Sequence, residues 1–136
     1  MAAQIIDGKA ISERLREDMK AEVAAMSEKG MKPCLAVIIV GEDPASKVYV
    51  RNKERACRQL GMDSILLRLP ETTSQEELIR RVDELNADKS VNGILVQLPL
   101  PGTIDEGEVL RRISPEKDVD GFTPVNVGRL TIGQQC

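Results

Sequence analysis

A tyrosine and a lysine that share one segment are the residues of this chain best suited to chemistry. Tyr49 and Lys53 lie four residues apart within SKVYVRNKERAC, and Ser46 lies three residues before Tyr49. On a helix, these spacings place a hydroxyl, a phenol and an amine along one stripe. Tyr49 is the only tyrosine, and Phe122 is the only other aromatic residue. We therefore predict a polar site along this stripe.

The lack of histidine makes Lys53 more important. Without histidine, the chain lacks the commonest general base near neutral pH and the Ser-His and Cys-His nucleophile systems. Neighbouring cations such as Arg51 and Arg55, together with partial burial, disfavour a charged ammonium group, so Lys53 could exchange protons near neutral pH. The simpler alternative is a solvated lysine on a helix surface.

Gln97 interrupts an otherwise apolar segment, GILVQLPLP. Its side-chain carbonyl could hold the amine of Lys53 in place. An amide satisfied by nearby backbone groups explains the residue equally well. Pro99 and Pro101 follow and stiffen the adjoining loop, because proline fixes its own backbone angle and lacks an N–H group.

Asp118 and Asp120 alternate with a valine just before a glycine. Two carboxylates at this spacing occur in exposed turns and, less often, in cation sites. A single aspartate at a loop apex can instead accept two hydrogen bonds from a ring of the amino-pyrimidine type. The spacing alone leaves these alternatives open.

The hydrophobic pattern predicts the elements that position these residues. Helices are expected over residues 10–29, 46–61, 74–88 and 105–113, and strands over 4–6, 35–40, 64–69 and 93–96. From Ser114 onward we expect a loop, with a weak strand pattern near 128–132. The alternation of strands and helices predicts an α/β fold, a three-layer sandwich with a mainly parallel sheet flanked by helices. Ligands bind at the carboxyl ends of strands in such sheets.

Composition argues against several other functions. With 136 residues and a net charge of −3, the chain is expected to form one domain that binds no nucleic acid. No apolar run approaches the roughly 20 residues of a membrane span, and the N-terminus lacks a secretory signal, so we expect a cytoplasmic protein without a membrane partner. The spacing of Cys34, Cys57 and Cys136 favours two buried thiols and one terminal thiol over a disulfide framework or a metal site.

Four segments together resemble one enzyme family. They are VGEDPASKVYVRNKERAC, GILVQLPLP, PEKDVDGF and NVGRL, and the resemblance extends from IIDGKAI to VNVGRLTIG. The chain resembles the N-terminal catalytic domain of the bifunctional methylenetetrahydrofolate dehydrogenase/methenyltetrahydrofolate cyclohydrolase family of one-carbon metabolism. The resemblance implies oxidation of 5,10-methylenetetrahydrofolate with NADP, and hydrolysis of 5,10-methenyltetrahydrofolate to 10-formyltetrahydrofolate.

The resemblance also implies roles for individual residues. Lys53 corresponds to the catalytic lysine, Gln97 tunes that lysine, and Tyr49 packs on the folate and orients it. Asp120 corresponds to the residue that binds the pterin-like ring. The substrate-binding residues expected from the resemblance are Tyr49, Ser46, Gln97, Leu98, Pro99 and Asp120.

By the same resemblance, residues 1–120 form the folate-binding catalytic domain and residues 121–136 begin a linker to an NADP-binding Rossmann domain. The sequence contains neither GxGxxG nor GxxxxGK[ST], so we expect no cofactor-binding residue in this chain, which looks truncated. The full-length enzyme is expected to be a homodimer. The alternatives are a cyclohydrolase without dehydrogenase activity, a non-catalytic folate-binding or dimerisation module, and an unrelated α/β domain.

Overall fold

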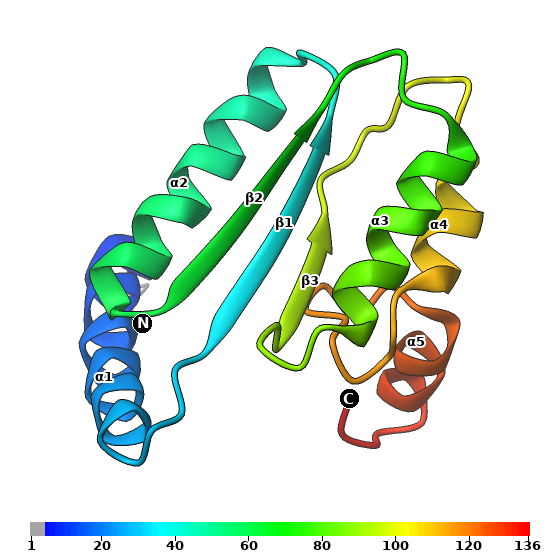
Figure 1. Ribbon diagram of the computed structural model, residues 1–136. Coiled ribbons are helices and arrows are strands. Elements are labelled where there is room, and N and C mark those ends of the chain that lie inside the picture. The colour runs from blue at the N-terminus through cyan, green and yellow to red at the C-terminus, as the bar shows by residue number, and fades with distance from the viewer. Residues whose placement is uncertain (1–4) are drawn as a thin grey trace.

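Strand β1 (Cys34–Val40) lies at the centre of a three-stranded parallel sheet (Figure 1). It pairs with β2 (Asp63–Leu69) on one side and β3 (Gly93–Val96) on the other, so that the strand order is β2-β1-β3. This computed structural model describes residues 5–136. Because the three strands run in the same direction, their carboxyl ends lie along one edge of the sheet, where the loops after β1 and β3 meet.

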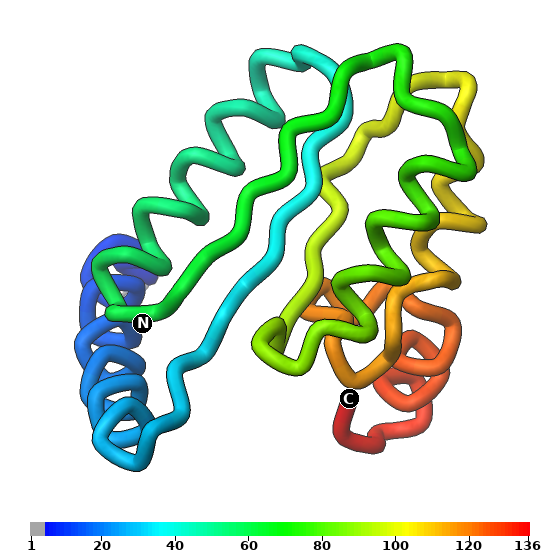
Figure 2. Tube along the Cα trace, viewed as in Figure 1, coloured from blue at the N-terminus to red at the C-terminus, as the bar shows by residue number. Residues whose placement is uncertain are grey.

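Helices cover both faces of the sheet, and the expected three-layer α/β sandwich is confirmed (Figures 1 and 2). The helices are α1 (Gly8–Glu28), α2 (Pro44–Leu60), α3 (Gln75–Ala87), α4 (Glu106–Arg112) and α5 (Pro124–Thr131). Helix α2 packs on β1 and β2, with α1 against its outer side. On the opposite side, α3 contacts β3 and α4.

The side chains of β1 alternate between two cores of unequal size. Ala36, Ile38 and Val40 face α3 and α4, where they belong to a large cluster of buried apolar residues. Val37 and Ile39 face α2, and among residues 5–136 Val50 and Leu95 complete the buried cluster on that side. The run LAVIIV is therefore buried on both faces, as expected for the central strand of a parallel sheet. The smaller core beneath α2 leaves room for a cavity there.

Short-range signals account for the ends of α2. Asp43 caps the N-terminus, where its carboxylate accepts a hydrogen bond from the Ser46 N–H at 2.7 Å, and this bond lowers the pKa of Asp43. Pro44 occupies the first turn, where its missing N–H has no helical partner to lose. Gly61 ends the helix with φ of +81°, a conformation that glycine adopts without steric cost. These signals fix which residues of α2 lie beside the ends of the strands.

Two expectations for the ends of the chain need correction. The strand expected at 4–6 is not formed by Ile5 and Ile6, which are exposed and irregular, and Gln4 lies outside the described residues. The expected loop with a strand near 128–132 is wrong, because α5 occupies this region. Thr123 caps α5 by accepting the Asn126 N–H, and the buried Asn126 side chain donates to the Pro115 carbonyl at 2.8 Å. These contacts outweigh the strand preference of the local sequence.

Helix α1 carries an apolar stripe that is largely exposed. Ile11, Leu15, Met19 and Met26 are each at least two-fifths exposed, and Val23 is the helix's buried residue. The expected helix is confirmed, with its N-cap at Asp7, but its stripe contributes little to the core. Within residues 5–136, no helix has both the length and the apolar character needed to cross a membrane.

Apolar helix residues in the core and on the surface should respond differently to truncation. Leu78 on α3 is fully buried in the large core, whereas the Leu15 side chain on α1 is about half exposed. We expect Leu78→Ala to lower the free energy of unfolding by about 2–5 kcal/mol, because it leaves a cavity in a packed core. Leu15→Ala, the matched control, should change it by no more than about 0.5 kcal/mol. Urea denaturation followed by far-UV circular dichroism measures both, and equal effects would contradict this assignment of the core.

Candidate active site

The first turn of α2 meets the loop after β3 at the carboxyl edge of the sheet. Ser46 is buried there, and its hydroxyl donates to the Leu98 carbonyl at 3.4 Å. Leu98 is half-buried, and Pro99, joined to it by a cis peptide bond, is exposed. The pairing of β1 with β3 brings these segments together, because Val96 lies beside Ile38 and the residues after Val96 therefore follow the end of β1, just before the turn into α2. Ser46 thus anchors the start of α2 to the loop after β3.

The side chains of Lys53 and Gln97 meet in the space between α2 and the end of β3. The amine of Lys53 donates to Gln97 Oε1 at 3.1 Å. Gln97 Nε2 donates to the Leu98 carbonyl at 2.8 Å, which turns the amide oxygen toward the lysine. The Gln97 N–H donates to the Ile38 carbonyl at 2.8 Å, so the backbone of Gln97 still follows β1. The amide is therefore fixed at both ends and holds the amine in one place.

Tyr49 lies one turn before Lys53 on the same side of α2. The lysine amine is 5.9 Å from the centre of the tyrosine ring, near the outer limit of a cation–π contact. The Tyr49 side chain is 60% exposed, although aromatic residues usually bury most of their surface. One face of an exposed ring beside an amine is open to a flat ligand.

Asp118 and Asp120 have different surroundings. The Asp118 carboxylate accepts from the N–H groups of Gly121 at 2.9 Å and Thr123 at 2.8 Å, and from Asn126 Nδ2 at 3.1 Å. Partial burial opposes ionisation of Asp118, but the hydrogen bonds from Thr123 and Asn126 outweigh it and lower the pKa. Both oxygens of Asp118 are thus occupied within its own turn.

Asp120 keeps its carboxylate free and faces Lys53. Its side chain is open to solvent on one side, yet the loss of water where it faces the protein raises its pKa. The positive charge of Lys53 opposes this shift, and the negative charge of Asp118 adds to it. Among residues 5–136, no cluster of three or more Asp, Glu or Cys side chains is arranged to hold a metal ion. The geometry therefore makes Asp120, and not Asp118, the carboxylate available to a ligand.

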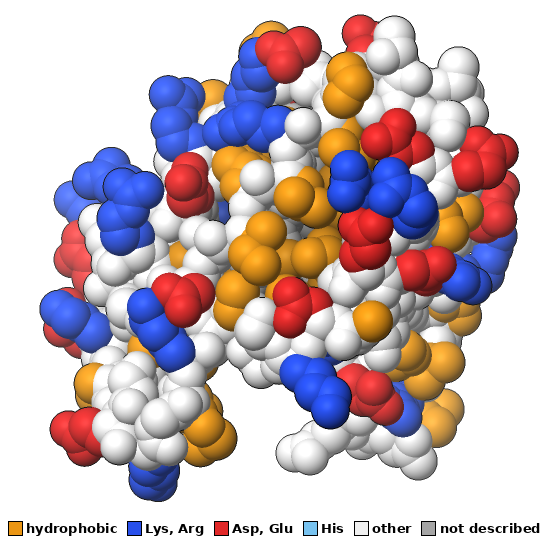
Figure 3. Space-filling model, viewed as in Figure 1, with side chains coloured by type: hydrophobic (Ala, Val, Ile, Leu, Met, Phe, Trp, Pro, Cys, Tyr) orange, Lys and Arg blue, Asp and Glu red, His pale blue; other side chains and the backbone are white. Residues whose placement is uncertain are grey.

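A cavity of about 460 Å³ lies between α2 and the turn that carries Asp120. Its lining is mostly apolar and includes Leu35, Leu95 and Val119, with Lys53 and Asp120 as its charged members. A concave apolar surface with a few polar groups is typical of sites for small organic ligands. On the face turned toward the viewer, Figure 3 shows hydrophobic side chains in the hollow between the two helical layers.

The two buried thiols line the same cavity. Cys34 and Cys57 are buried and free, and Cys136 is exposed, as expected. Burial is the main reason why the pKa values of Cys34 and Cys57 are raised. Both therefore stay as neutral thiols at physiological pH and act as small apolar side chains.

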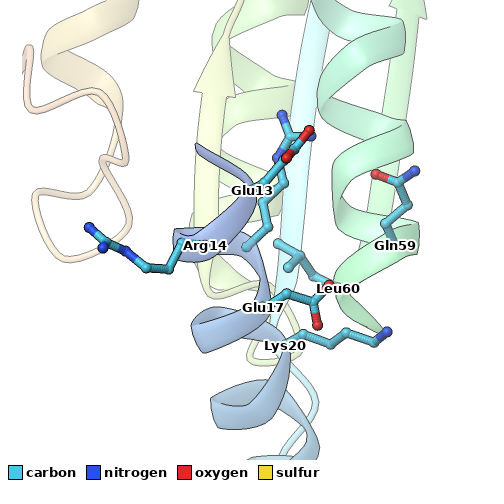
Figure 4. Close-up of a pocket in the computed structure, with 7 residues that line it drawn as sticks. Glu13, Arg14, Glu17, Lys20, Gln59 and Leu60 are labelled. Atoms are coloured by element: carbon cyan, nitrogen blue, oxygen red, sulfur yellow. The ribbon is translucent and has the colours of Figure 1, made fainter. Parts of the chain in front are cut away.

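A second hollow, of about 610 Å³, lies between α1 and the end of α2 (Figure 4). Charged and polar side chains of both signs line it, among them Glu13, Arg14, Glu17 and Lys20. None of the polar residues that surround Lys53 belongs to this lining. Mixed surface charge is well solvated and selects no particular ligand, so we do not assign a site here.

The structure thus brings together Ser46, Tyr49, Lys53, Gln97 and Leu98, with Asp120 near the lysine. Pro99 follows Leu98 but lines a different hollow, beside Gly41 and Glu71. The sequence did not reveal the apolar lining of the cavity. Its members come from β1, β3, α2 and the loop before α5, so no local pattern joins them.

Comparison with known proteins identifies the family. The family model described as the catalytic domain of tetrahydrofolate dehydrogenase/cyclohydrolase matches residues 6–120. The bifunctional protein FolD of Moorella thermoacetica is 56% identical over 136 residues, which are 100% of this chain and 49% of that protein. The chain spans about half the length of the curated relatives that it matches.

Solved structures agree with the sequence comparison. The bifunctional FolD enzyme of Campylobacter jejuni, a methylenetetrahydrofolate dehydrogenase/cyclohydrolase, superposes with a TM-score of 0.96 at 46% identity, covering 98% of this chain and 48% of that one. The Trypanosoma brucei enzyme, solved with NADP cofactor and inhibitor, gives a TM-score of 0.93 at 40% identity, covering 100% and 47%. This chain belongs to the tetrahydrofolate dehydrogenase/cyclohydrolase family, whose catalytic-domain model matches it over residues 6–120.

Proposed function

We propose that this chain is the folate-binding catalytic half of an enzyme that oxidises 5,10-methylenetetrahydrofolate with NADP and hydrolyses 5,10-methenyltetrahydrofolate to 10-formyltetrahydrofolate. The observation that carries the proposal is the contact between the Lys53 amine and the Gln97 carbonyl at 3.1 Å, beside the exposed ring of Tyr49. The family and the fold agree with it, because FolD relatives are named as bifunctional enzymes.

Lys53 is suited to the proton transfers of the hydrolytic step. Water must attack a cationic carbon of the methenyl bridge, and a neutral amine can accept a proton from that water, whereas an ammonium has no free electron pair with which to do so. Opening of the ring then breaks a carbon–nitrogen bond: the newly formed ammonium returns its proton to the departing nitrogen, and the hydroxyl group of the adduct loses its proton to water as the formyl carbonyl forms, so that one proton is released overall. Gln97 holds the amine through its carbonyl oxygen and adds no second negative charge to that of Asp120 near the lysine.

The remaining site residues bind and orient the folate. The ring of Tyr49 offers a flat surface to an aromatic part of the substrate. Asp120 can accept two hydrogen bonds from the amino-pyrimidine part of the pterin-like ring, because neither of its oxygens is committed to the turn. Ser46 and Leu98 join the first turn of α2 to the loop after β3 at the carboxyl edge of the sheet, beside Pro99.

The turn between β1 and α2 does not fit the pyrophosphate of NADP. In the doubly wound folds that bind dinucleotides, a glycine-rich turn lets the pyrophosphate approach the N-terminus of a helix. Here the turn between β1 and α2 reads GEDP, and its Asp43 carboxylate caps the helix N-terminus, where a phosphate would bind. We therefore assign no part of the hydride transfer to these residues, and propose that NADP binds to another part of the full-length enzyme.

We further propose a cytoplasmic enzyme of one-carbon metabolism that supports purine biosynthesis and acts as a homodimer at full length. The composition and the family support the first part of this proposal. Size-exclusion chromatography with light scattering on the full-length protein tests the second part, and a monomer at micromolar concentration would contradict it.

The proposed hydrolysis can be measured from the loss of methenyltetrahydrofolate absorbance, with a buffer blank for spontaneous hydrolysis. We expect the chain to exceed the blank in proportion to its concentration. Binding of 5-formyltetrahydrofolate, a stable folate, is measured in parallel by titration calorimetry. Folate binding without any gain over the blank would favour the alternative, a non-catalytic folate-binding module. A lack of both would overturn the proposed function for this chain.

Replacing Gln97 by glutamate tests the role of the amide. The substitution keeps the size of the side chain but places a negative charge about 3 Å from the Lys53 amine, and this charge favours the ammonium form. We expect the hydrolysis rate at neutral pH to fall by about ten-fold or more, since an ammonium cannot act as a base. Initial rates of the variant and the unmodified chain, measured side by side at neutral pH, show the effect. An unchanged rate would show that Gln97 does not act through Lys53.

A further inference from the structure

The carboxylate of Asp120 owes its position to its neighbours. Among residues 5–136, it takes part in no hydrogen bond, and its side chain is exposed. A ligand-binding group must nevertheless be held close to its productive geometry before the ligand arrives. The residues on either side of Asp120 show how the turn is fixed.

Lys117 fixes the chain before the turn. Its amine donates to three backbone carbonyls at the end of α3, those of Leu85 at 3.0 Å, Asn86 at 2.9 Å and Asp88 at 2.7 Å. Its own carbonyl accepts from the Ile94 N–H at 2.7 Å. All three protons of the ammonium group are thus used, and the last carbonyls of a helix are satisfied by a cation, which is a favourable arrangement. This ties the start of the turn to both α3 and β3.

Asp118 fixes the chain after the turn. One oxygen accepts from the N–H of Gly121, and the other accepts from Thr123 N–H and Asn126 Nδ2. These bonds close the backbone around Asp120 and join it to the first turn of α5. Hydrogen bonds from N–H groups to a charged acceptor are stronger than hydrogen bonds to a neutral acceptor.

Val119 packs the turn against the start of β3. A Cβ atom added to Gly93, at the start of β3, would lie 2.5 Å from Cγ1 of Val119, which is much too close. The valine side chain therefore rests directly on the glycine backbone. Gly93 is buried and lacks a side chain at the place where the turn comes down on the strand.

We propose that Asp118 is a positioning residue for ligand binding, which acts by closing the turn that presents Asp120 to the folate. Gly93 also positions this turn, because the lack of a side chain on Gly93 leaves the space that Val119 occupies. The inference rests on the proposed function, because it concerns the affinity for the folate. If Asp118 only stabilised the fold, its loss would lower the folate affinity no further than the loss of folded protein explains. A positioning role predicts a larger fall in affinity.

The test compares Asp118→Asn with Asp83→Asn in the intact chain. Asp83 is a matched control, because its carboxylate also accepts two hydrogen bonds, from Arg112 at 2.6 and 2.8 Å, but it joins α3 to α4 outside the site. In Asp118→Asn, the new NH₂ group must face N–H donors, so at least one bond of the turn is lost. We expect the Kd for 5-formyltetrahydrofolate to rise about ten-fold in Asp118→Asn and to stay within about two-fold in Asp83→Asn, since displacement of a binding group by about 1 Å is costly.

Two further readouts separate positioning from general loss of structure. Amide hydrogen exchange at Gly121 and Thr123 should accelerate in Asp118→Asn while the core strands stay protected. Gly93→Ala, which leaves Asp118 intact, should also raise the Kd, because Val119 must move. Thermal unfolding of every variant shows whether the fold is kept.

The outcomes distinguish the inference from the function on which it rests. If the unmodified chain binds the folate and Asp120→Asn weakens binding, but Asp118→Asn and Gly93→Ala bind normally, the positioning role is wrong and the proposed function stands. Equal weakening by Asp118→Asn and Asp83→Asn would also overturn the positioning role. If the unmodified chain binds no folate, the proposed function itself fails and the inference fails with it.

Discussion

Replacement of Lys53 by methionine is expected to abolish most of the hydrolysis of methenyltetrahydrofolate by this chain. Methionine keeps an unbranched apolar side chain beside Tyr49 and the cavity but removes the amine that meets Gln97. General base catalysis by a positioned side chain is worth about 10²–10⁴-fold. We therefore expect the rate to fall at least about 100-fold, or to the spontaneous rate where that is reached first.

Lys47→Met is the matched control for this substitution. Lys47 lies on the same helix, has a partly exposed side chain and pairs with the exposed Glu42, away from Gln97. The control should keep the hydrolysis rate within about two-fold, since an exposed ion pair contributes about 0–1 kcal/mol to stability and lies outside the chemistry. The Kd for 5-formyltetrahydrofolate should change much less than the rate in Lys53→Met. Full activity of Lys53→Met would refute the proposed role of the lysine.

The elements with the strongest local signals could be predicted from the sequence. The run LAVIIV is typical of a strand buried on both faces, and Asp43, Pro44 and Gly61 mark both ends of α2. The stripe of Ser46, Tyr49 and Lys53 followed as well, because helix geometry alone determines which residues lie above one another.

The contacts between distant segments could only be proposed. The amine of Lys53 meets Gln97 across 44 residues because β1 pairs with β3, and no short-range pattern encodes that pairing. The choice between Asp118 and Asp120 likewise depends on which backbone N–H groups each carboxylate reaches in the folded turn. The spacing of Asp118 and Asp120 in the sequence does not show which of the two carboxylates is available to a ligand.

The prediction of a strand near 128–132 is wrong because contacts with distant segments override the local sequence preference. Two valines, a threonine and an isoleucine favour a strand in residues 125–132, and Gly128 weakens a helix. The structure forms a helix because Thr123 caps it and because Asn126 is buried among polar partners at Pro115 and Asp118. For α1 the pattern predicted the helix correctly, but periodicity does not reveal what covers an apolar stripe.

Asp120→Asn should weaken folate binding and stabilise the fold at the same time. Asparagine has one acceptor oxygen in place of two, and it lacks the charge that pairs with donor groups of an amino-pyrimidine ring. A hydrogen bond to a charged group is worth about 1.5–3 kcal/mol, so we expect the Kd for 5-formyltetrahydrofolate to rise about 10–100-fold. Titration calorimetry measures the change. Asp18→Asn, at an exposed position on α1, serves as the control.

The effect of Asp120→Asn on stability depends on pH in a defined direction. Partial loss of water, which Lys53 opposes and Asp118 reinforces, raises the pKa of Asp120 above its usual value of 3.8 in the folded chain. Between the unfolded and folded pKa values the folded state binds more protons, so the stability of the unmodified chain falls as the pH rises through this range. Asp120→Asn should therefore unfold at a higher temperature at pH 7, and this gain should vanish below about pH 3.8.

A residue that costs stability but improves binding belongs to a ligand site, because selection for folding alone would remove it. Thermal unfolding from pH 3 to 7.5, with Asp18→Asn alongside, measures the effect of Asp120→Asn on stability. Titration with the folate measures its effect on binding. A variant that binds as tightly as the unmodified chain and is more stable would show that Asp120 carries strain without a binding role. A variant that is less stable at pH 7 would show that its carboxylate supports the turn, a task that the geometry gives to Asp118.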